Sequence, residues 1–190
     1  MIVYGAGGLG RELSKEMGLS CCYADDLDDP SMSCGPDTWE PNSNFIAAVG
    51  NGMVRSSMVK KAMSFGHRPN WWNNGDYDPP GRLQPNVIIM KGSLLTVDIT
   101  IEEGVLVNIG AMVGHDCILR KYCSIQPHAN LSGCEVGPFA YIGMGANIVA
   151  AKDGRLRQIG ASAVIGAGAV LTHDVMAGEV WVGNPARRIR

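Results

Sequence analysis

The chain has 190 residues, a formal net charge of −2 and an apolar content of 46%. This length supports one large domain or two small ones, and the apolar content supplies a packed core. The near-neutral charge gives no general attraction to nucleic acid or to anionic lipid, and no apolar run approaches the ~18 residues of a membrane span. The N-terminus lacks the basic and apolar segments of a secretory signal, so we expect a cytoplasmic protein.

Residues 1–81 alternate short apolar runs with helical stretches. The predicted strands are 1–4, 21–24, 45–49 and 71–72, and the predicted helices are 11–17 and 54–65. This order predicts a small Rossmann-like parallel sheet with short crossovers. The polar, proline-rich stretch 73–82 is the expected join to a second domain, which covers residues 82–190.

A glycine loop connects the first predicted strand to the first predicted helix. Gly5, Gly7 and Gly10 fit the pattern G-x-G-x-x-G, in which the backbone approaches a phosphate and the helix N-terminus favours its charge. Residues 1–81 provide only one mononucleotide half of a dinucleotide-binding fold, so a nucleotide that carries a sugar fits better than NAD. The residues expected to contact it here are Gly7, Gly8, Leu9 and Gly10.

Polar residues follow the next two predicted strands. Asp25 and Asp26 end the second strand, where a carboxylate can accept hydrogen bonds from a base or a ribose; alternatively, they only begin a polar run. Gly50 and Asn51 close the third strand, and Arg55 follows them. One interpretation directs Arg55 to a pyrophosphate, and the other leaves it solvated at the start of a helix.

From Ile89 onward an aliphatic residue recurs at every sixth position, a regularity expected by chance only once in about 10⁵ trials. The series is Ile89, Leu95, Ile101, Val107, Val113, Leu119, Ile125 and Leu131; after a one-residue slip it resumes at Val136, Ile142 and Ile148, and then at Ile159, Ile165 and Leu171. A mostly small residue lies two positions before each following aliphatic residue, on the same side of a strand. Together the two series predict a left-handed parallel β-helix of hexapeptide repeats over residues 82–190.

Two irregularities interrupt the repeat. Glu135 falls where a small residue is expected, at the one-residue slip. Residues 149–158 are five residues longer than the hexad allows and contain charges and a glycine, which predicts a loop extruded from one corner.

His115 is the predicted general base among the four histidines. It lies outside the inward phase of the repeat, and Asp116 beside it can orient the ring and stabilise its charged form. A zinc site of the kind found in β-helical carbonic anhydrases needs three converging histidines, two of them closely spaced, and the sequence has no such pair, so no metal is predicted. The six cysteines lack a C-x-x-C pair and are expected to be reduced, with Cys117 pointing into the β-helix.

These features resemble the sialic-acid O-acetyltransferase-like sugar acyltransferases, and most closely the bacterial N-acetyltransferases of nucleotide-linked 4-amino sugars. The likeness covers nearly the whole chain. It is based on Val3-Tyr4-Gly5-Ala6-Gly7-Gly8, Asp25-Asp26, Val49-Gly50-Asn51 with Arg55, Asn108-x₆-His115-Asp116-Cys117, Leu131-Ser132-Gly133, Ile165-Gly166-Ala167-Gly168-Ala169-Val170 and Val182-Gly183-Asn184-Pro185-Ala186-Arg187.

The resemblance implies a homotrimer with acetyl-CoA bound in clefts between neighbouring β-helices. It implies that His115 is the catalytic base, that Asp116 supports it, and that Asn108 lies near the acceptor sugar. It also implies that the Gly133 N–H meets the thioester carbonyl. The remaining residues that it places at the cofactor are Gly143, Gly145, Gly166, Gly168 and Arg187.

Three functions remain open on the sequence. The first is N-acetylation of a nucleotide-linked amino sugar, and the second is O-acetylation of a sialic acid or a similar sugar. The third is a non-catalytic β-helix that binds a nucleotide sugar or serves in assembly. The set formed by Asn108, His115 and Asp116 argues against the third, and the glycine loop with Asp25 and Asp26 favours an acceptor that carries a nucleotide.

Overall fold

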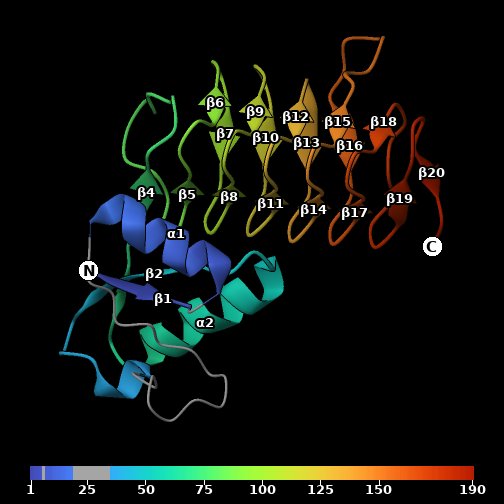
Figure 1. Ribbon diagram of the computed structural model, residues 1–190. Helices are drawn as coiled ribbons and strands as arrows, with labels where there is room; N and C mark the ends of the chain where they lie inside the picture. Colours follow the sequence, from blue (N-terminus) through green and yellow to red (C-terminus); the bar gives the residue numbers. More distant parts are fainter. Residues whose placement is uncertain (6, 19–34) are drawn as a thin grey trace.

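A computed structural model describes residues 1–5, 7–18 and 35–190 (Figure 1). It contains a small α/β unit followed by a β-helix. Asp25, Asp26 and the strand predicted at 21–24 lie outside the described residues, as do Cys21, Cys22 and Cys34.

The N-terminal unit is a three-stranded parallel sheet with two helices. Its elements are β1 (Ile2–Tyr4), α1 (Gly8–Met17), the 3-10 turn η1 (Pro36–Thr38), β2 (Asn44–Ala47), α2 (Gly52–Ser64) and β3 (Arg68–Pro69), with the strand order β1-β2-β3. The first turn of α1 requires glycine at position 10, because a Cβ on Gly10 would lie 1.8 Å from the Gly5 carbonyl oxygen in the loop before the helix. Asn51 caps α2 by accepting hydrogen bonds from Met53 N and Val54 N at 3.0 and 3.2 Å.

The strand predicted at 71–72 belongs to the β-helix and not to this sheet. β4 (Trp72–Asn73) pairs with β5 (Ile88–Ile89), and β3 is the outer described strand of the small sheet. The chain therefore enters the β-helix before the first regular hexad.

The β-helix has three parallel faces, which we number in the order in which the chain meets them. Face I holds β4, β5, β8 (Leu106–Val107), β11 (Ser124–Ile125), β14 (Tyr141–Ile142), β17 (Val164–Ile165), β19 (Val180–Val182) and the antiparallel β20 (Arg187–Arg188). Face II holds β6 (Leu94–Leu95), β9 (Met112–Val113), β12 (Asn130–Leu131), β15 (Asn147–Ile148) and β18 (Val170–Leu171). Face III holds β7 (Thr100–Ile101), β10 (Ile118–Leu119), β13 (Cys134–Val136) and β16 (Arg157–Ile159).

The hexad predicts this core well. Every residue of the aliphatic series is buried except Ile101, which is partly buried and packs against the same cluster. At the slip, Cys134 takes the small inward position, fully buried, and Glu135 points outward to an ion pair with Arg120 at 2.7 Å. The predicted slip arises because the turn 132–133 is one residue shorter than the turn 114–116, so Cys134 and not Glu135 takes the inward position.

The N-terminal unit packs against the outer side of face I. Val3, Leu13 and Ile46 share a buried cluster with Ile88 and Leu106. In Figure 1 this unit lies on one side of the β-helix, and the loop between β15 and β16 projects from the opposite side. No helix within the described ranges is long and apolar enough to cross a membrane.

Candidate functional site

The two loops of the N-terminal unit meet the β-helix at the corner between faces I and II. β1 and β2 are adjacent and parallel, so the loops after them leave the same edge of the sheet. A Cβ on Gly5 would lie 2.9 Å from the Ala48 carbonyl oxygen, which shows how closely the loops approach. Leu9 and Ile109 pack against one cluster, and a Cβ on Gly50 would lie 3.8 Å from Gln126 Nε2. The predicted glycine-loop, Gly50 and Asn108 positions therefore gather in one region.

Two buried amides line this corner. Asn108 Oδ1 accepts a hydrogen bond from Ile109 N at 2.8 Å, and Asn108 Nδ2 donates to Gln126 Oε1 at 3.4 Å. Gln126 Nε2 is buried and has no hydrogen-bond partner among the residues that the model describes. The sequence analysis missed Gln126, although it lies 18 residues after Asn108, one full turn further along the same corner.

Neither interpretation of Arg55 holds. The side chain is fully buried, and its Nε donates to Gly104 O at 2.8 Å while Nη1 donates to Val49 O at 2.6 Å. Nη2 donates to Tyr122 O, Cys123 O and Ser124 Oγ. Burial lowers the pKa of Arg55 to about 10, so it stays charged at neutral pH. This cation joins the N-terminal unit to the β-helix and does not face a pyrophosphate.

His115 and Asp116 form an exposed pair at the corner between faces II and III. His115 Nδ1 lies 2.6 Å from Asp116 Oδ2, and the two side chains are 72% and 61% exposed. This hydrogen bond raises the pKa of His115. With Nδ1 engaged, the other ring nitrogen, Nε2, is the one available to a substrate.

His115 and the acceptor-side residues lie at different corners of the same chain. Strand β9 of face II separates Asn108 from His115, and the N-terminal unit that carries the glycine loop packs on face I. Within a single chain, the predicted general base and the predicted acceptor-binding residues therefore do not lie in one site.

The turn after the His115 coil contains Gly133, the predicted thioester contact. The contact between Cys117 Sγ and Cys134 Sγ, 3.9 Å apart, lowers the pKa of Cys117, and the Gly133 N–H lowers it further. Cys117 is fully buried, as its phase in the repeat predicts.

The other predicted cofactor residues have structural explanations of their own. A Cβ on Gly143 would lie 2.6 Å from Ala167 N in the next coil, and a Cβ on Gly166 would lie 2.7 Å from Val182 Cγ1. Gly145 and Gly168 have φ of 65° and 66°, which favours glycine in these turns. Arg187 lies in β20 and donates to Ala186 O at 2.9 Å. Among the described residues no three histidine, cysteine, aspartate or glutamate side chains converge as a metal site.

No protein-family model matches the chain. It is 28% identical over 214 aligned residues to GDP-perosamine N-acetyltransferase of Escherichia coli O157:H7, which covers 99% of this chain and 95% of that protein. It is also 32% identical over 113 residues to mitochondrial gamma carbonic anhydrase 1 of Arabidopsis thaliana, covering 54% of this chain and 39% of that protein.

Solved structures that resemble the whole chain include two with bound ligands. The acetyltransferase domain of PglB from Neisseria gonorrhoeae, in complex with acetyl coenzyme A, superposes with a TM-score of 0.86 at 25% identity, covering 99% and 98% of the two chains. PerB from Caulobacter crescentus, in complex with CoA and GDP-perosamine, shares the fold with a TM-score of 0.83 at 24% identity, covering 100% and 96%. The predicted left-handed β-helix and the predicted resemblance to bacterial sugar N-acetyltransferases are confirmed.

Proposed function

We propose that this chain transfers the acetyl group of acetyl-CoA to the amino group of a nucleotide-linked amino sugar. The carrying observation is the full-length similarity to a GDP-perosamine N-acetyltransferase, in a chain whose exposed His115 and Asp116 form a hydrogen-bonded pair. The relative's name makes a GDP-linked 4-amino sugar the first acceptor to test. The N-terminal unit, as a Rossmann-like half-domain, holds the nucleotide through the backbone of Gly7–Gly10 and through Gly50 and Asn51.

His115 acts as the general base in this proposal. Asp116 fixes the ring through Nδ1, so Nε2 takes the proton that the acceptor amine loses as its nitrogen attacks the thioester carbonyl. The tetrahedral intermediate then expels the CoA thiolate, which recovers the proton from the imidazolium. Transfer is direct, because the nearest cysteine, Cys117, is fully buried. The free base form of His115 is required, so its raised pKa moves the acidic limb of the activity profile to higher pH.

The complete site is proposed to need two chains. Asn108 and the glycine loop lie at the corner between faces I and II, whereas His115 lies at the corner between faces II and III. A closed homotrimer lets the His115 corner of one chain meet the acceptor side of its neighbour, and cyclic closure satisfies all three sites equally. Acetyl-CoA then lies between the two β-helices.

The test is release of CoA thiol from acetyl-CoA over a panel of UDP-, GDP- and dTDP-linked amino sugars. We expect turnover with at least one member, a product acetylated on nitrogen, and none with the matching 4-hydroxy sugar. Turnover only with hydroxyl acceptors, such as a sialic acid, would replace this function by O-acetylation. Absence of turnover and of CoA binding would leave a non-catalytic role.

A further inference from the structure

Four successive turns stack along the corner between faces II and III. They are 114–116, which holds His115, then 132–133, then the long loop 149–156, and then 172–174. The stack is continuous: a Cβ on Gly133 would lie 3.3 Å from Ala150 Cβ, and Arg157 N donates to Gly133 O at 2.9 Å. The long loop therefore lies directly beyond the turn that follows the His115 turn.

A buried cation holds the long loop in shape. Arg157 occupies the inward position that small residues fill in other coils, opposite Cys134 in the strand register. Its Nε donates to Val149 O at 2.9 Å and its Nη2 to Ala150 O at 3.2 Å. These bonds fix the two residues at which the loop leaves β15.

The other charged side chains of the loop form ion pairs, except Lys152. Arg155 pairs with Asp153 at 3.0 Å and with Asp174 at 2.7 Å, and Asp174 also accepts from Arg157 at 3.4 Å. Lys152 is exposed, and in the described part of the chain its ammonium has no hydrogen-bond or ion-pair partner. The cations Lys152, Arg155 and Arg157 thus outnumber the carboxylates Asp153 and Asp174 by one.

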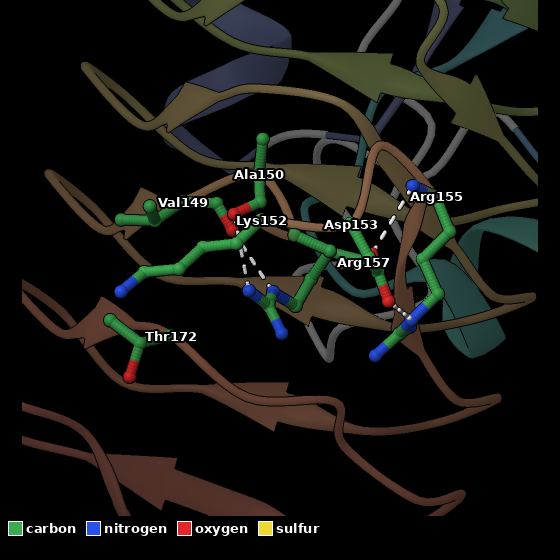
Figure 2. Close-up of a pocket in the computed structure, with 8 residues that line it drawn as sticks. Val149, Ala150, Lys152, Asp153, Arg155, Arg157 and Thr172 are labelled. Atoms are coloured by element: carbon green, nitrogen blue, oxygen red, sulfur yellow. Dashed lines mark hydrogen bonds and ion pairs between the residues drawn. The ribbon is translucent and has the colours of Figure 1, made fainter.

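The loop borders an open pocket of about 320 Å³, which Lys152 and Thr172 help to line. Figure 2 shows the Lys152 side chain extended above Thr172, away from the Arg155–Asp153 pair, with its amino group unengaged. The Thr172 hydroxyl lies 3.0 Å from His173 Nδ1 and can donate or accept a further hydrogen bond. An ammonium and a hydroxyl on a net positive pocket suit a phosphate group.

The distance from His115 to this pocket matches the distance from the thioester of acetyl-CoA to its phosphates. Neighbouring coils lie about 4.8 Å apart, so the loop and Thr172, two and three coils beyond His115, are roughly 10 and 14 Å from it along the axis. In CoA about 13 bonds separate the thioester sulfur from the first phosphorus, which spans roughly 15 Å when nearly extended. A thioester at His115 therefore places the first phosphate of CoA at the distance of this pocket, with the second phosphate and the ribose 3′-phosphate further along the molecule.

We infer that the 149–156 loop is a phosphate-binding element for the CoA moiety, with Lys152 as its principal cation and Thr172 as a supporting hydroxyl. The inference rests on the proposed function, because it takes acetyl-CoA as the donor. It assigns a role in donor binding to residues of the insertion, which lie outside the hexapeptide repeat. The 3′-phosphate and the pyrophosphate share the same chemistry, and the experiment separates them.

The experiment titrates wild type, Lys152→Met and Lys152→Arg with CoA and with dephospho-CoA, and compares acetyl-CoA with the phosphate-free donor acetyl-pantetheine in turnover. Lys121→Met, which removes a lysine paired with Glu103 at another corner, is the matched control. We expect Lys152→Met to bind CoA about tenfold more weakly, the scale of one hydrogen bond to a charged group. Lys152→Arg and Lys121→Met should bind CoA as wild type does. The kcat/KM for acetyl-pantetheine should not change.

Dephospho-CoA distinguishes the two phosphates. If it binds wild type and Lys152→Met equally, the lysine contacts the 3′-phosphate; if the tenfold loss persists, it contacts the pyrophosphate. Unchanged CoA affinity, an equal loss with acetyl-pantetheine, or a loss of GDP or UDP affinity instead would each overturn the inference. If the wild-type protein binds no CoA, the proposed function itself is refuted. If the wild type is active and Lys152→Met binds CoA as tightly as the wild type does, only the role of Lys152 is refuted.

Discussion

The two corners that border face II follow different rules. Between faces I and II the connections 108–111, 126–129, 143–146 and 166–169 all have four residues, and glycines such as Gly143 and Gly166 let one coil rest on the next. Between faces II and III the turns vary in length, from two residues at 132–133 to eight at 149–156. The regular corner builds the scaffold and receives the N-terminal unit, whereas the irregular corner presents His115 and the unmatched Lys152. The proposed catalytic and phosphate-binding residues therefore lie at the corner where the turn length is irregular.

The largest expected effect tests the irregular corner at His115. Because His115 is the proposed general base, His115→Ala should lower turnover by ~10²–10⁴ at neutral pH, while CoA affinity stays at the wild-type value. Steady-state kinetics with a calorimetric CoA titration measure both. Turnover within threefold of wild type would remove His115 from the mechanism.

The next effect concerns the buried junction between the two parts. Arg55→Met leaves the carbonyls of Val49, Gly104 and Tyr122 without their donor, so we expect a loss of about 3–5 kcal/mol in the free energy of unfolding. Denaturant unfolding measures it, with the exposed Arg68→Met as control. A stable variant that had lost only nucleotide affinity would restore the pyrophosphate role that the structure rejects.

A substitution at the regular corner, between faces I and II, should weaken binding of the acceptor sugar and leave binding of acetyl-CoA unchanged. Gln126→Leu removes the buried Nε2 that lies beside Gly50 and lacks a partner in the described structure. We expect the KM for the amino-sugar acceptor to rise about tenfold, as for loss of one hydrogen bond to a charged or strongly polar group. The KM for acetyl-CoA should not move; a change in the acetyl-CoA KM alone would assign this corner to the donor.

A smaller effect follows from the pairing of His115 with Asp116. The hydrogen bond raises the pKa of His115, so activity should rise with pH through a value above the ordinary histidine value of about 6.5. Asp116→Asn removes the charge that stabilises the imidazolium, and the acidic limb should move to lower pH. A pH profile of kcat/KM measures the shift; a limb that stayed in place would mean that another group titrates.

The smallest effect is expected inside the β-helix. Cys117 is fully buried against Cys134, so Cys117→Ala should cost about 1 kcal/mol of stability and no activity. Thermal unfolding and turnover at matched concentration test this. Abolished turnover in a folded Cys117→Ala variant would indicate an acyl-enzyme intermediate.

The sequence predicted the β-helix because each coil repeats the same inward constraint, and the burial of Val107, Val113 and Leu119 follows from spacing alone. It failed where a contact depends on residues far apart in the chain. Arg55 is buried by oxygens up to 69 positions away, which no local pattern records. Arg157 fills an inward position reserved elsewhere for small residues, because the adjoining loop supplies its carbonyl acceptors.

The placement of His115 and Asn108 at different corners of the β-helix has a consequence for mixtures of variants. If each site combines the base of one chain with the acceptor side of the next, His115→Ala and Asn108→Ala damage different halves of it. Two such preparations, each inactive alone, should recover activity when they are unfolded together and refolded. Random assembly of a symmetric trimer leaves about one quarter of the sites with both halves intact. Complementation of this kind cannot occur when both residues serve the same chain's site, so recovery near that fraction identifies catalysis as a property of the interface.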